Sequence, residues 1–458
     1  MAKMWRKLFF LCFISVAFGV AGHGIVLNFK QAMTLGIFTT SIMGTLFFWS
    51  FRLSFAFLGT GLLLITRAID LDNFLRLTML EVVLFLAGMM IVVSLLKDSG
   101  FFAWIVTLIL RAPHLTGRKF TLIIIGISAV LACLVDEVTS IIFMVAAILE
   151  ICDYYEVNPT PFVIISVLAT NIGSAATVLG NPIGIIIATA AHLGFEDFLL
   201  RAAPLAFVAL IVMTLIVFWW FRRDIRKLDE HIRHMGANDV LMKLIDVPME
   251  HQLRVGLGIF FGMIGLIALH RRLEMFLGLL PNTMLLIMPM LTAGVIMIWK
   301  SHKAREYVEK GVEWWTLLFF MLLFAQAGTL KFTGATDVFA QHLLGFAQSS
   351  PKFLLGVILW TSAIGSSVLD NVIVVVTYAP VIRSFLALGL DVHNFWWALL
   401  FGGCLGGNIT LIGSTANIVA LGLLEKEGKP SISFRDWFGV GLCVGVATTF
   451  VVWVFLSR

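Results

Sequence analysis

Charged residues are scarce in this chain. Of its 458 residues, 13% are Asp, Glu, Lys or Arg, whereas 60% are hydrophobic. About a quarter of the residues in an ordinary soluble domain are charged. A chain with so little charge cannot cover the apolar surface that it carries, which excludes a soluble globular protein and leaves the membrane as its solvent.

Cysteine and histidine patterns typical of disulfide frameworks or metal sites are also missing. No CxxC spacing occurs among the five cysteines, and each lies in or beside an apolar segment, which indicates a small buried hydrophobe. The histidines of the charged stretch near residue 240 have no acid or cysteine at ligand spacing. The five cysteines are Cys12, Cys133, Cys152, Cys404 and Cys443.

Alternating apolar and polar segments, which are typical of a transmembrane β-barrel, do not occur. Apolar runs of about 20 residues recur instead, long enough to span the bilayer as helices. Basic residues cluster in short loops between these runs, which favours a cytoplasmic position for the loops over nucleic-acid binding. Basic residues also precede the first run without a cleavage site after it, so we expect a retained helix over 8–27. The sequence therefore predicts an all-α polytopic membrane protein.

The unusual polar residues of this chain occur twice, about half a chain apart. Three features recur with nearly the same separation in the sequence. They are an acid at the start of an apolar run, an acidic motif inside an apolar stretch, and a Thr-x-x-Gly break. The pairs are Glu81 and Glu313 (313 − 81 = 232), Asp136 and Asp370 (370 − 136 = 234), and Thr177 and Thr410 (410 − 177 = 233). A duplicated membrane unit with polar interruptions at matching positions indicates a secondary-transporter site.

Two stretches predict helical hairpins that are too short to cross the bilayer. The stretch 119–151 has two apolar arms joined at Asp136-Glu137, and 352–388 has the same form with Asp370-Asn371 at its tip. Each arm is shorter than the about 20 residues that a span needs. Because non-helical backbone at membrane depth must be buried in protein or line a watery cavity, we expect both re-entrant tips to face inward.

Two further stretches, 161–193 and 394–425, predict helices that are interrupted near their centres. The interruptions are Gly180-Asn181-Pro182 and Gly413-Ser414-Thr415. Proline removes an amide donor and stops the helix, and helix ends leave N–H and C=O groups with partial charges. We expect the two tips and the two breaks to converge on one midplane site with pseudo-two-fold symmetry.

The acids at the hairpin tips have two compatible interpretations. A carboxylate in the middle of a membrane costs about 2.5–3.5 kcal/mol, so it must be solvated, paired, protonated or bound to an ion. Carboxylate oxygens suit Na⁺ and H⁺, and repulsion between Asp136 and Glu137 is expected to raise the pKa of one of them, which allows proton exchange nearer physiological pH. The alternative is helix capping, because Asp136 and Asp370 each precede a helical run.

Uncharged polar residues accompany these acids. Asn171 and Asn408 lie on the interrupted helices, where they offer an ion their amide oxygens or, alternatively, form an interhelical hydrogen bond. The candidate Na⁺ ligands are Asp136, Asn171, Asp370 and Asn408. The other candidate ion- or substrate-binding residues are Glu137, Thr139, Thr177, Asn181, Asn371, Thr410, Ser414, Thr415 and Asn417.

Other polar and glycine-rich positions have simpler explanations. Glu81 and Glu313 stand at helix starts, where the helix dipole or an interfacial position accounts for them. Lys97 and Lys331 end the same repeated helices, and we expect them to be interfacial anchors. The glycines in 402–407 favour close helix packing over a role in the site.

Four motifs in this order resemble the ArsB/NhaD-type ion transporter superfamily, which includes arsenite permeases, sodium/proton antiporters and the melanosomal P protein. The motifs are VDEVTSIIFMVAAILEI, TNIGSAATVLGNPIGIII, LDNVIVVVTYAPVI and GGCLGGNITLIGSTANIVALG. The resemblance covers most of the chain. It implies an inverted-repeat fold in which a mobile transport domain moves against a scaffold domain by an elevator-type displacement, usually in a homodimer.

By this resemblance, the hairpin tips and the breaks at 180–184 and 413–417 form the ion and substrate site. Many relatives have Pro-Pro-Asn in the first break, where this chain has Pro182-Ile183-Gly184. The counterpart Asn417 remains in the second break. The first half-site therefore lacks one polar side chain.

The predicted organisation has four parts. Residues 1–70 supply N-terminal scaffold helices, and residues 71–222 form the first repeat with its hairpin and broken helix. A polar, charged linker over 223–254 is expected on the cytoplasmic side. Residues 255–458 form the second repeat.

The leading functional hypothesis is a secondary active transporter coupled to H⁺ or Na⁺ that is most like a sodium/proton antiporter. The alternative is a permease for anions or metalloids such as arsenite, silicate or oxyanions; a large dicarboxylate is disfavoured, since the tips offer no Arg and Asp370 would repel it. Neither the repeated rings of a channel nor the residue clusters of an enzyme are evident. We expect lipid, a small inorganic ion and a second copy as partners, no cofactor besides a coupling ion, and a bacterial-type plasma membrane.

Overall fold

The computed structural model describes residues 27–48, 51–101, 104–105, 107, 115–235, 250–346, 350–429 and 432–458. The elements assigned within these ranges are all helical, and seven helices are long and apolar enough to cross a membrane. The predicted all-α polytopic fold is therefore confirmed. The predicted helix at 8–27 lies outside the described residues except for Leu27.

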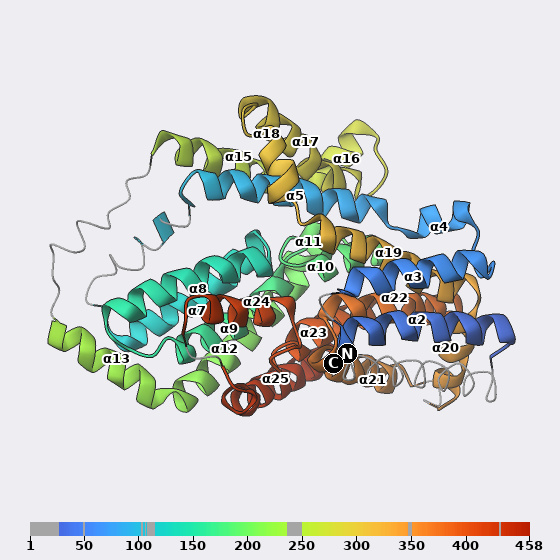
Figure 1. Cartoon of the computed structure of the whole chain (residues 1–458). Coiled ribbons are helices and arrows are strands. Elements are labelled where there is room, and N and C mark those ends of the chain that lie inside the picture. The colour runs from blue at the N-terminus through green and yellow to red at the C-terminus, as the bar shows by residue number, and fades with distance from the viewer. Residues whose placement is uncertain are drawn as a thin grey trace, which may run out of the picture.

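The helices of the two halves of the chain are labelled in chain order in Figure 1. The first half contains α2 (Phe29–Phe47), α3 (Arg52–Ile65), α4 (Leu71–Leu77), α5 (Leu80–Asp98), α7 (Gly117–Leu134), α8 (Glu137–Tyr154), α9 (Thr160–Gly173), η2 (Ser174–Ala176), α10 (Pro182–Ala191), α11 (Phe195–Asp197), η3 (Phe198–Ala202), α12 (Ala203–Trp220) and α13 (Arg222–Met235). The second half contains α15 (His251–Ala268), α16 (His270–Leu277), α17 (Thr283–Trp299), α18 (Ala304–Glu306), η4 (Tyr307–Gly311), α19 (Trp314–Phe332), α20 (Ala335–Phe346), α21 (Pro351–Val368), α22 (Asn371–Ala387), α23 (His393–Gly406), α24 (Thr415–Lys426) and α25 (Phe434–Leu456).

The helix pairs α7–α8 and α21–α22 form the two predicted hairpins, and two residues join the helices of each pair. Asp136 accepts a hydrogen bond from Thr139 N at 2.8 Å, in the first turn of α8. Asp370 accepts one from Val372 N at 3.0 Å, in the first turn of α22. Both acids therefore cap the helices that follow them, which agrees with the capping interpretation of their sequence positions.

The helix pairs α9–α10 and α23–α24 are the two interrupted helices. Pro182 occupies the first position of α10, where its missing N–H costs nothing. Asn181 Oδ1 accepts from Gly184 N at 2.8 Å, and Ser414 Oγ accepts from Ala416 N at 3.2 Å. A polar side chain thus caps each helix that resumes after a break.

The two halves repeat one close helix contact as well as their motifs. Gly173 on α9 lies against α7, and a Cβ added there would be 2.5 Å from Ala129 Cα. Gly406 on α23 lies against α21, and its added Cβ would be 2.6 Å from Ala363 Cα. The offsets are 406 − 173 = 233 and 363 − 129 = 234. Only glycine permits these approaches, so for Gly406 the packing interpretation is correct.

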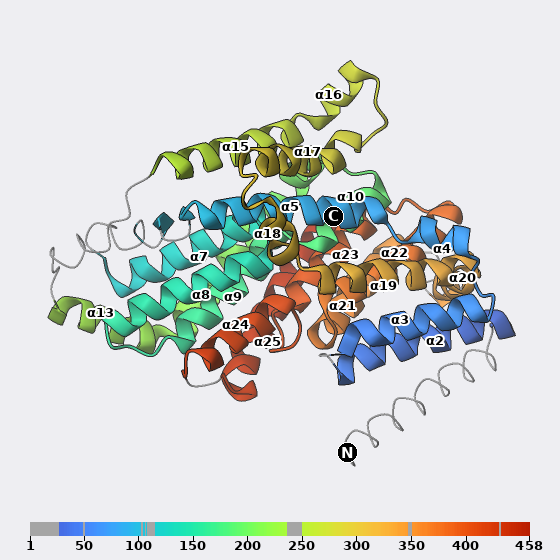
Figure 2. The same cartoon turned by 45° about the horizontal axis from the view of Figure 1, so that its top comes forward.

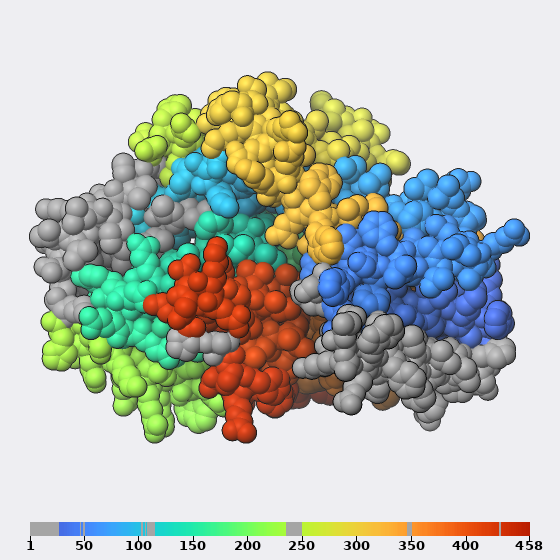
Figure 3. Space-filling model, in the orientation of Figure 1, coloured from blue at the N-terminus to red at the C-terminus, as the bar shows by residue number. Residues whose placement is uncertain are grey.

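The helices outside the hairpins and breaks also pair in corresponding ways. α3 lies along α19, and α17 lies along α5, as Figures 1 and 2 both show. The second contact is close: an added Cβ at Gly88 of α5 would be 2.8 Å from the carbonyl carbon of Pro289 in α17. On the face seen in Figure 3, the red C-terminal residues lie between green residues of the first half and blue N-terminal helices.

The described part of the predicted polar linker 223–254 is largely helical. It begins with helix α13, which packs on α7. Ile225 and Leu228 are buried, and Gly117 N donates to Asp229 Oδ1 at 3.0 Å. Apolar residues at positions 225, 228 and 232 recur at helical spacing within a charged sequence, so one narrow apolar face folds the segment onto α7. The helix α16 was likewise not expected from the sequence.

Candidate functional site

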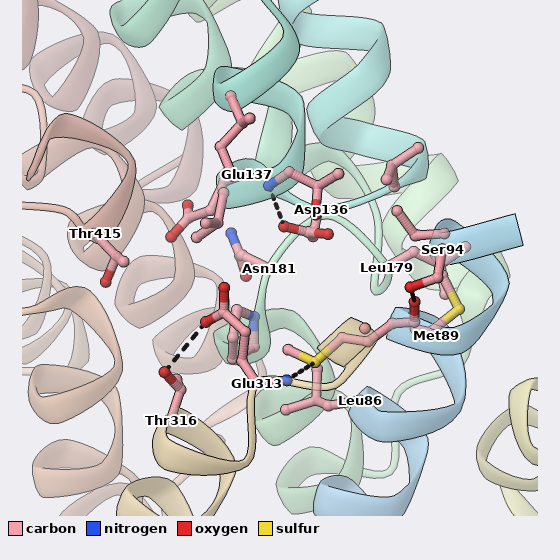
Figure 4. A pocket seen from close by; sticks show the side chains of 18 of the residues that line it. Leu86, Met89, Ser94, Asp136, Glu137, Leu179, Asn181, Glu313, Thr316 and Thr415 are labelled. Carbon is pink, nitrogen blue, oxygen red and sulfur yellow. Dashed lines mark hydrogen bonds between the residues drawn. The ribbon is translucent and has the colours of Figure 1, made fainter. Parts of the chain in front are cut away.

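A cavity of about 210 Å³ lies beside the hairpin tips and the interrupted helices (Figure 4). Its other wall comes from α5 and from the start of α19. Six of the residues singled out from the sequence line it: Asp136, Glu137, Thr139, Asn181, Asn371 and Thr415. Tips and breaks from both halves of the chain therefore meet at one cavity.

Glu137 connects three of the converging segments. Its side chain is 2% exposed, Oε1 accepts from Asn371 Nδ2 at 3.3 Å, and Oε2 accepts from Ser174 Oγ at 3.3 Å. Asn371 belongs to the second hairpin and Ser174 to the first break. The carboxylate of the first hairpin tip is thus held by neutral donors from two other segments.

The second hairpin tip is tied to the second break. Asp370 is 5% exposed, and its Oδ2 accepts from Thr415 Oγ1 at 2.5 Å. Next to it, Asn371 Oδ1 is buried and has no hydrogen-bond partner in the described structure. The cavity wall therefore carries a buried acceptor oxygen that a bound donor or cation would satisfy.

The amides of the interrupted helices bind one another. Asn171 Nδ2 donates to Asn408 Oδ1 and to Asn417 Oδ1, both at 2.9 Å, and Ser414 Oγ donates to Asn171 Oδ1 at 3.0 Å. Asn417 Nδ2 donates in turn to the carbonyls of residues 407 and 410, each at 2.8 Å. All four side chains are buried. This amide cluster is the interhelical hydrogen bonding that was the alternative to ion binding by Asn171 and Asn408. It joins the two breaks.

The threonines of the repeated Thr-x-x-Gly motif have matching structural roles. Thr177 Oγ1 donates to the carbonyl of Cys133, and Thr410 Oγ1 donates to the carbonyl of Ser367. The partners are also one repeat apart, since 367 − 133 = 234. Each threonine thus fastens a break to the last turn before a hairpin tip, with its hydroxyl hydrogen engaged.

Asn181 holds the first break together from within. Its Nδ2 donates to Ser174 Oγ at 2.8 Å and to Cys404 Sγ at 3.2 Å, while its Oδ1 caps α10. A Cβ at Gly184 would be 3.0 Å from the carbonyl oxygen of Val178. This close approach gives a physical reason for glycine where many relatives of the superfamily carry Asn.

Three residues of the site were not identified from the sequence. Glu313 lines the cavity opposite Asp136 and Glu137, and Thr316 Oγ1 donates to Glu313 Oε2 at 3.3 Å (Figure 4). Arg52 Nη2 donates to Thr316 Oγ1 at 3.0 Å. The match between Glu313 and Glu81 was visible, but nothing in the sequence showed which helix start faces the tips.

The structure adds two observations on basic residues. Lys97, expected to anchor α5 at the membrane interface, is an exposed residue at the end of that helix and, together with Lys310, lines the cavity. The hairpin tips themselves carry no Arg, but Arg52 Nη2 donates to Thr316, a residue of the cavity wall. The site therefore combines acidic and basic groups. Lys331, at the end of α19, binds Asp337 and Ser384.

The four candidate Na⁺ ligands occupy different surroundings. Asp136 lines the cavity, Asn171 and Asn408 belong to the amide cluster, and Asp370 binds Thr415. Among the described hydrogen bonds, none joins either acid to the two asparagines. Within the described residues there is also no group of three His, Cys, Asp or Glu side chains placed to hold a metal ion. An ion bound by these four residues stays a prediction.

Several known proteins similar to this chain are described as transporters. An uncharacterized transporter of Mycobacterium tuberculosis (strain H37Rv) is 30% identical over 383 residues, which cover 82% of this chain and 85% of that protein. The human P protein is 25% identical over 431 residues, covering 79% of this chain and 51% of the P protein. This second relative belongs to the superfamily that the motifs resemble, so that resemblance is confirmed.

The fold has a solved counterpart in the YdaH transporter of Alcanivorax borkumensis. The TM-score is 0.53 at 15% identity, and the match covers 84% of this chain and 86% of YdaH. Residues 42–402 match the family described as Citrate transporter, CitMHS. This multi-pass integral membrane protein is a transporter and belongs to the CitMHS citrate transporter family.

Proposed function

We propose that this protein is a secondary active transporter in which the cavity binds H⁺ or Na⁺ together with, or in exchange for, its solute. The observation that carries the proposal is Glu137. It is a buried carboxylate at a hairpin tip, it lines the cavity, and neutral donors from the other hairpin and from a break hold it. Such a group is suited to exchange a cation with the cavity.

The energetics of burial support this assignment. Two neutral hydrogen bonds compensate only part of the cost of an ionised carboxylate in a membrane protein's interior. Asp370 and Asp136 stand near Glu137 and repel it electrostatically. A proton or a bound cation removes both penalties, and its loss restores them. The charge state of the acidic tip is therefore coupled to what the cavity holds.

The repeated contacts support an inverted-repeat mechanism. Matching glycines and threonines hold the hairpins to the interrupted helices in both halves, so these segments can move as one transport domain. The pairs α3–α19 and α5–α17 are the corresponding scaffold candidates. Alternating access then requires movement of one unit against the other around the central site, as in other repeat transporters. An elevator-type displacement in a homodimer is the form that we propose.

Sodium/proton antiport is the leading candidate activity, because acids dominate the hairpin-tip side of the cavity. One observation favours a second candidate, an anionic solute such as a carboxylate. Lys97 and Lys310 line the cavity, and Arg52 lies behind its wall. The family description, citrate transporter, agrees with that second candidate. In both cases the tip acids bind the coupling cation.

The charge distribution supports an orientation in the membrane. The helix α13 carries a cluster of Arg and Lys directly after α12. Basic segments next to membrane helices stay in the cytoplasm. We propose a bacterial-type plasma membrane with α13 on the cytoplasmic side, which protease accessibility of that segment in oriented vesicles would test.

Transport by the purified protein in liposomes distinguishes the candidate activities. A pH gradient is imposed, and Na⁺, Li⁺, K⁺, arsenite, silicate and citrate are added in turn while internal pH and solute uptake are recorded. Gradient dissipation by Na⁺ or Li⁺ alone establishes antiport, and citrate uptake that depends on the gradient establishes the anionic alternative. Uptake of any of these solutes that is indifferent to both H⁺ and Na⁺ refutes cation coupling.

A further inference from the structure

An ion pair joins the loop after α10 to the helix α16. Arg271 Nη2 of α16 binds Asp197 Oδ2, which also accepts a hydrogen bond from Gly194 N at 2.8 Å. Asn282, just before α17, donates from Nδ2 to the carbonyl of Leu193 at 3.3 Å. The cavity is lined by other residues. We call these contacts between residues 193–197 and residues 270–282 the latch.

The two sides of the latch fit closely. A Cβ added at Gly194 would be 2.8 Å from His270 Nε2 and 2.7 Å from Arg271 Nε, and His270 is fully buried. Glu274 of α16 is also buried, and its two oxygens accept from backbone amides around the start of α17 at 2.8 and 3.1 Å. The side of the latch formed by α16 is therefore fixed to α17.

The latch connects the two units of the proposed elevator movement. Leu193–Asp197 follows α10, which is part of the first interrupted helix and thus of the proposed transport domain. The other side belongs to the scaffold, because α16 is fixed to α17 and α17 packs on α5. Displacement of one unit against the other must break the latch. A contact that exists in only one of two states stabilises that state.

The latch lies at the opposite end of the membrane helices from α13. Two spans show this: Phe195–Trp220, which ends with α12, and His251–Ala268, which is α15. The latch stands at the start of the first span and just after the second, whereas α13 directly follows the first. In Figures 1 and 2, α13 lies at the left of the molecule and α16 lies to the right of α15.

The cavity reaches the surface at the α13 end. Ser94 and Lys97, in the last turns of α5, line it, and Lys97 is exposed. A Cβ added at Gly256, in the second turn of α15, would be 3.2 Å from the hydroxyl oxygen of Ser99, which follows α5. The end of α5 is therefore beside the start of α15, far from the latch at the end of α15. The cavity opens on one side of the molecule, and the latch closes the other.

The second half has a different contact at the corresponding place. With the offset of 233, residues 193–197 correspond to 426–430 (193 + 233 = 426; 197 + 233 = 430). There, Lys429 Nζ binds Asp153 Oδ1 of α8, in the first hairpin. This ion pair joins two parts of the proposed transport domain, whereas the ion pair of the first half joins that domain to the scaffold.

We propose that Asp197 and Arg271 are positioning residues of the transport cycle. Their ion pair holds the transport domain in the state whose cavity opens at the α13 end, and it must break before the site opens at the other end. With α13 in the cytoplasm, the latch closes the outer side of the protein. The proposal rests on the alternating access of the proposed function, but not on the identity of the cation or the solute.

Side-specific labelling of a cavity cysteine tests the latch without any solute. Thr139 lines the cavity from the first hairpin, so Thr139→Cys reports the side to which the transport domain opens. A membrane-impermeant maleimide is added to vesicles on the side from which trypsin does not reach α13. Mass spectrometry of the peptides separates the introduced cysteine from the native ones. Its labelling rate is proportional to the population that is open to that side.

Arg271→Gln in the Thr139→Cys chain should raise this rate about two- to fivefold, the factor that a partly exposed ion pair contributes to an equilibrium. Arg271→Lys keeps the charge and should restore the slow rate. Arg272→Gln is the matched control, because Arg272 is an exposed neighbour on the same helix, and it should change nothing. Asn282→Gly removes the contact with Leu193, tolerates the φ of 63° at this position and should also accelerate labelling.

Two results would overturn the latch. One is labelling of folded Arg271→Gln at the rate of Arg272→Gln. The other is an equal acceleration from both sides of the membrane, which indicates a loosened structure instead of a change of state. Size-exclusion elution identical to that of the wild type establishes folding. If Arg271→Gln does not fold, Asn282→Gly is judged against Arg272→Gln by the same two criteria.

Failure of the latch and failure of the proposed function are distinguishable. Cation-coupled transport by the wild type, together with unchanged labelling of Arg271→Gln, refutes the latch alone. Accelerated labelling of Arg271→Gln from the far side, in a protein whose wild type moves no cation, refutes cation coupling alone.

Discussion

The substitutions Gly173→Ala and Gly406→Ala test whether the two halves depend on the same helix approach. At both positions the added Cβ meets backbone, 2.5 Å from Ala129 Cα and 2.6 Å from Ala363 Cα. Backbone atoms of a packed helix cannot rotate away as a side chain can, so each helix pair must separate. Overpacking of this kind costs about 1–3 kcal/mol. Because the contacts match, the two costs should be similar.

Matched controls isolate this cost from helix propensity. Gly126 on α7 and Gly422 on α24 also lie in helices, and nothing would lie within 4 Å of a Cβ at either position. Alanine gains about 0.5–1 kcal/mol over glycine in a helix interior, where both controls lie, whereas Gly173 and Gly406 are the last residues of α9 and α23. A loss of stability in the variants therefore reflects the overpacking, and the controls show the effect of alanine without it.

The assay is unfolding of the detergent-solubilised protein followed by intrinsic fluorescence. Gly173→Ala and Gly406→Ala should both unfold at lower temperature than the wild type, whereas Gly126→Ala and Gly422→Ala should unfold at the same or a higher temperature. If Gly173→Ala or Gly406→Ala is as stable as its control, the helix pair in which that glycine lies does not need glycine. If only one half is sensitive, the account of matching contacts in the two halves is wrong.

Three further substitutions address individual contacts of the site. Asn171→Leu leaves the amide partners of the cluster unpaired and should destabilise the protein by about 1–3 kcal/mol, measured by the same unfolding assay; wild-type stability would mean that the cluster does not hold the breaks together. Thr177→Val and Thr410→Val each remove a hydroxyl that fastens a break to a hairpin, so both should lower the transport rate to a similar extent, and a large effect from one alone would contradict their equivalence. Lys310→Met should raise the KM for an anionic solute about tenfold if that solute is the cargo, and an unchanged KM for citrate would remove Lys310 from solute binding.

The elements that the sequence predicts well are those marked by local chemistry. The hairpins and breaks are short-range features: Asp136 and Asp370 cap the helices that follow them, and Pro182 cannot continue a helix. The nearly constant spacing between the repeated motifs also predicts matching contacts. Thr177 and Thr410 each donate to a carbonyl in the last turn before a hairpin tip. These features needed no knowledge of how distant helices pack.

The features that the sequence does not reveal depend on distant partners. Asn171 and Asn408 are 237 residues apart, and only the folded chain shows that their amides satisfy one another. Glu313 and Lys97 stand at helix ends, where a membrane interface explains them equally well until the position of the cavity is known. The helix α13 was not predicted, because its sequence is highly charged and its apolar face is too narrow to give a clear helical pattern.

The central claim is that Glu137 carries the coupling cation, and the proton stoichiometry of transport by Glu137→Gln tests it most directly. Glutamine keeps the shape of the side chain and one acceptor oxygen, replaces the other oxygen by an NH2 donor, and cannot exchange a proton. Glu150→Gln is the matched control, because Glu150 is an exposed residue of the same helix α8. Both proteins are reconstituted in liposomes, and protons moved per solute are measured under an imposed pH gradient. The account predicts that Glu137→Gln loses gradient-driven transport by about tenfold or more while Glu150→Gln behaves as the wild type. A folded Glu137→Gln protein with wild-type rate and wild-type proton stoichiometry would contradict it.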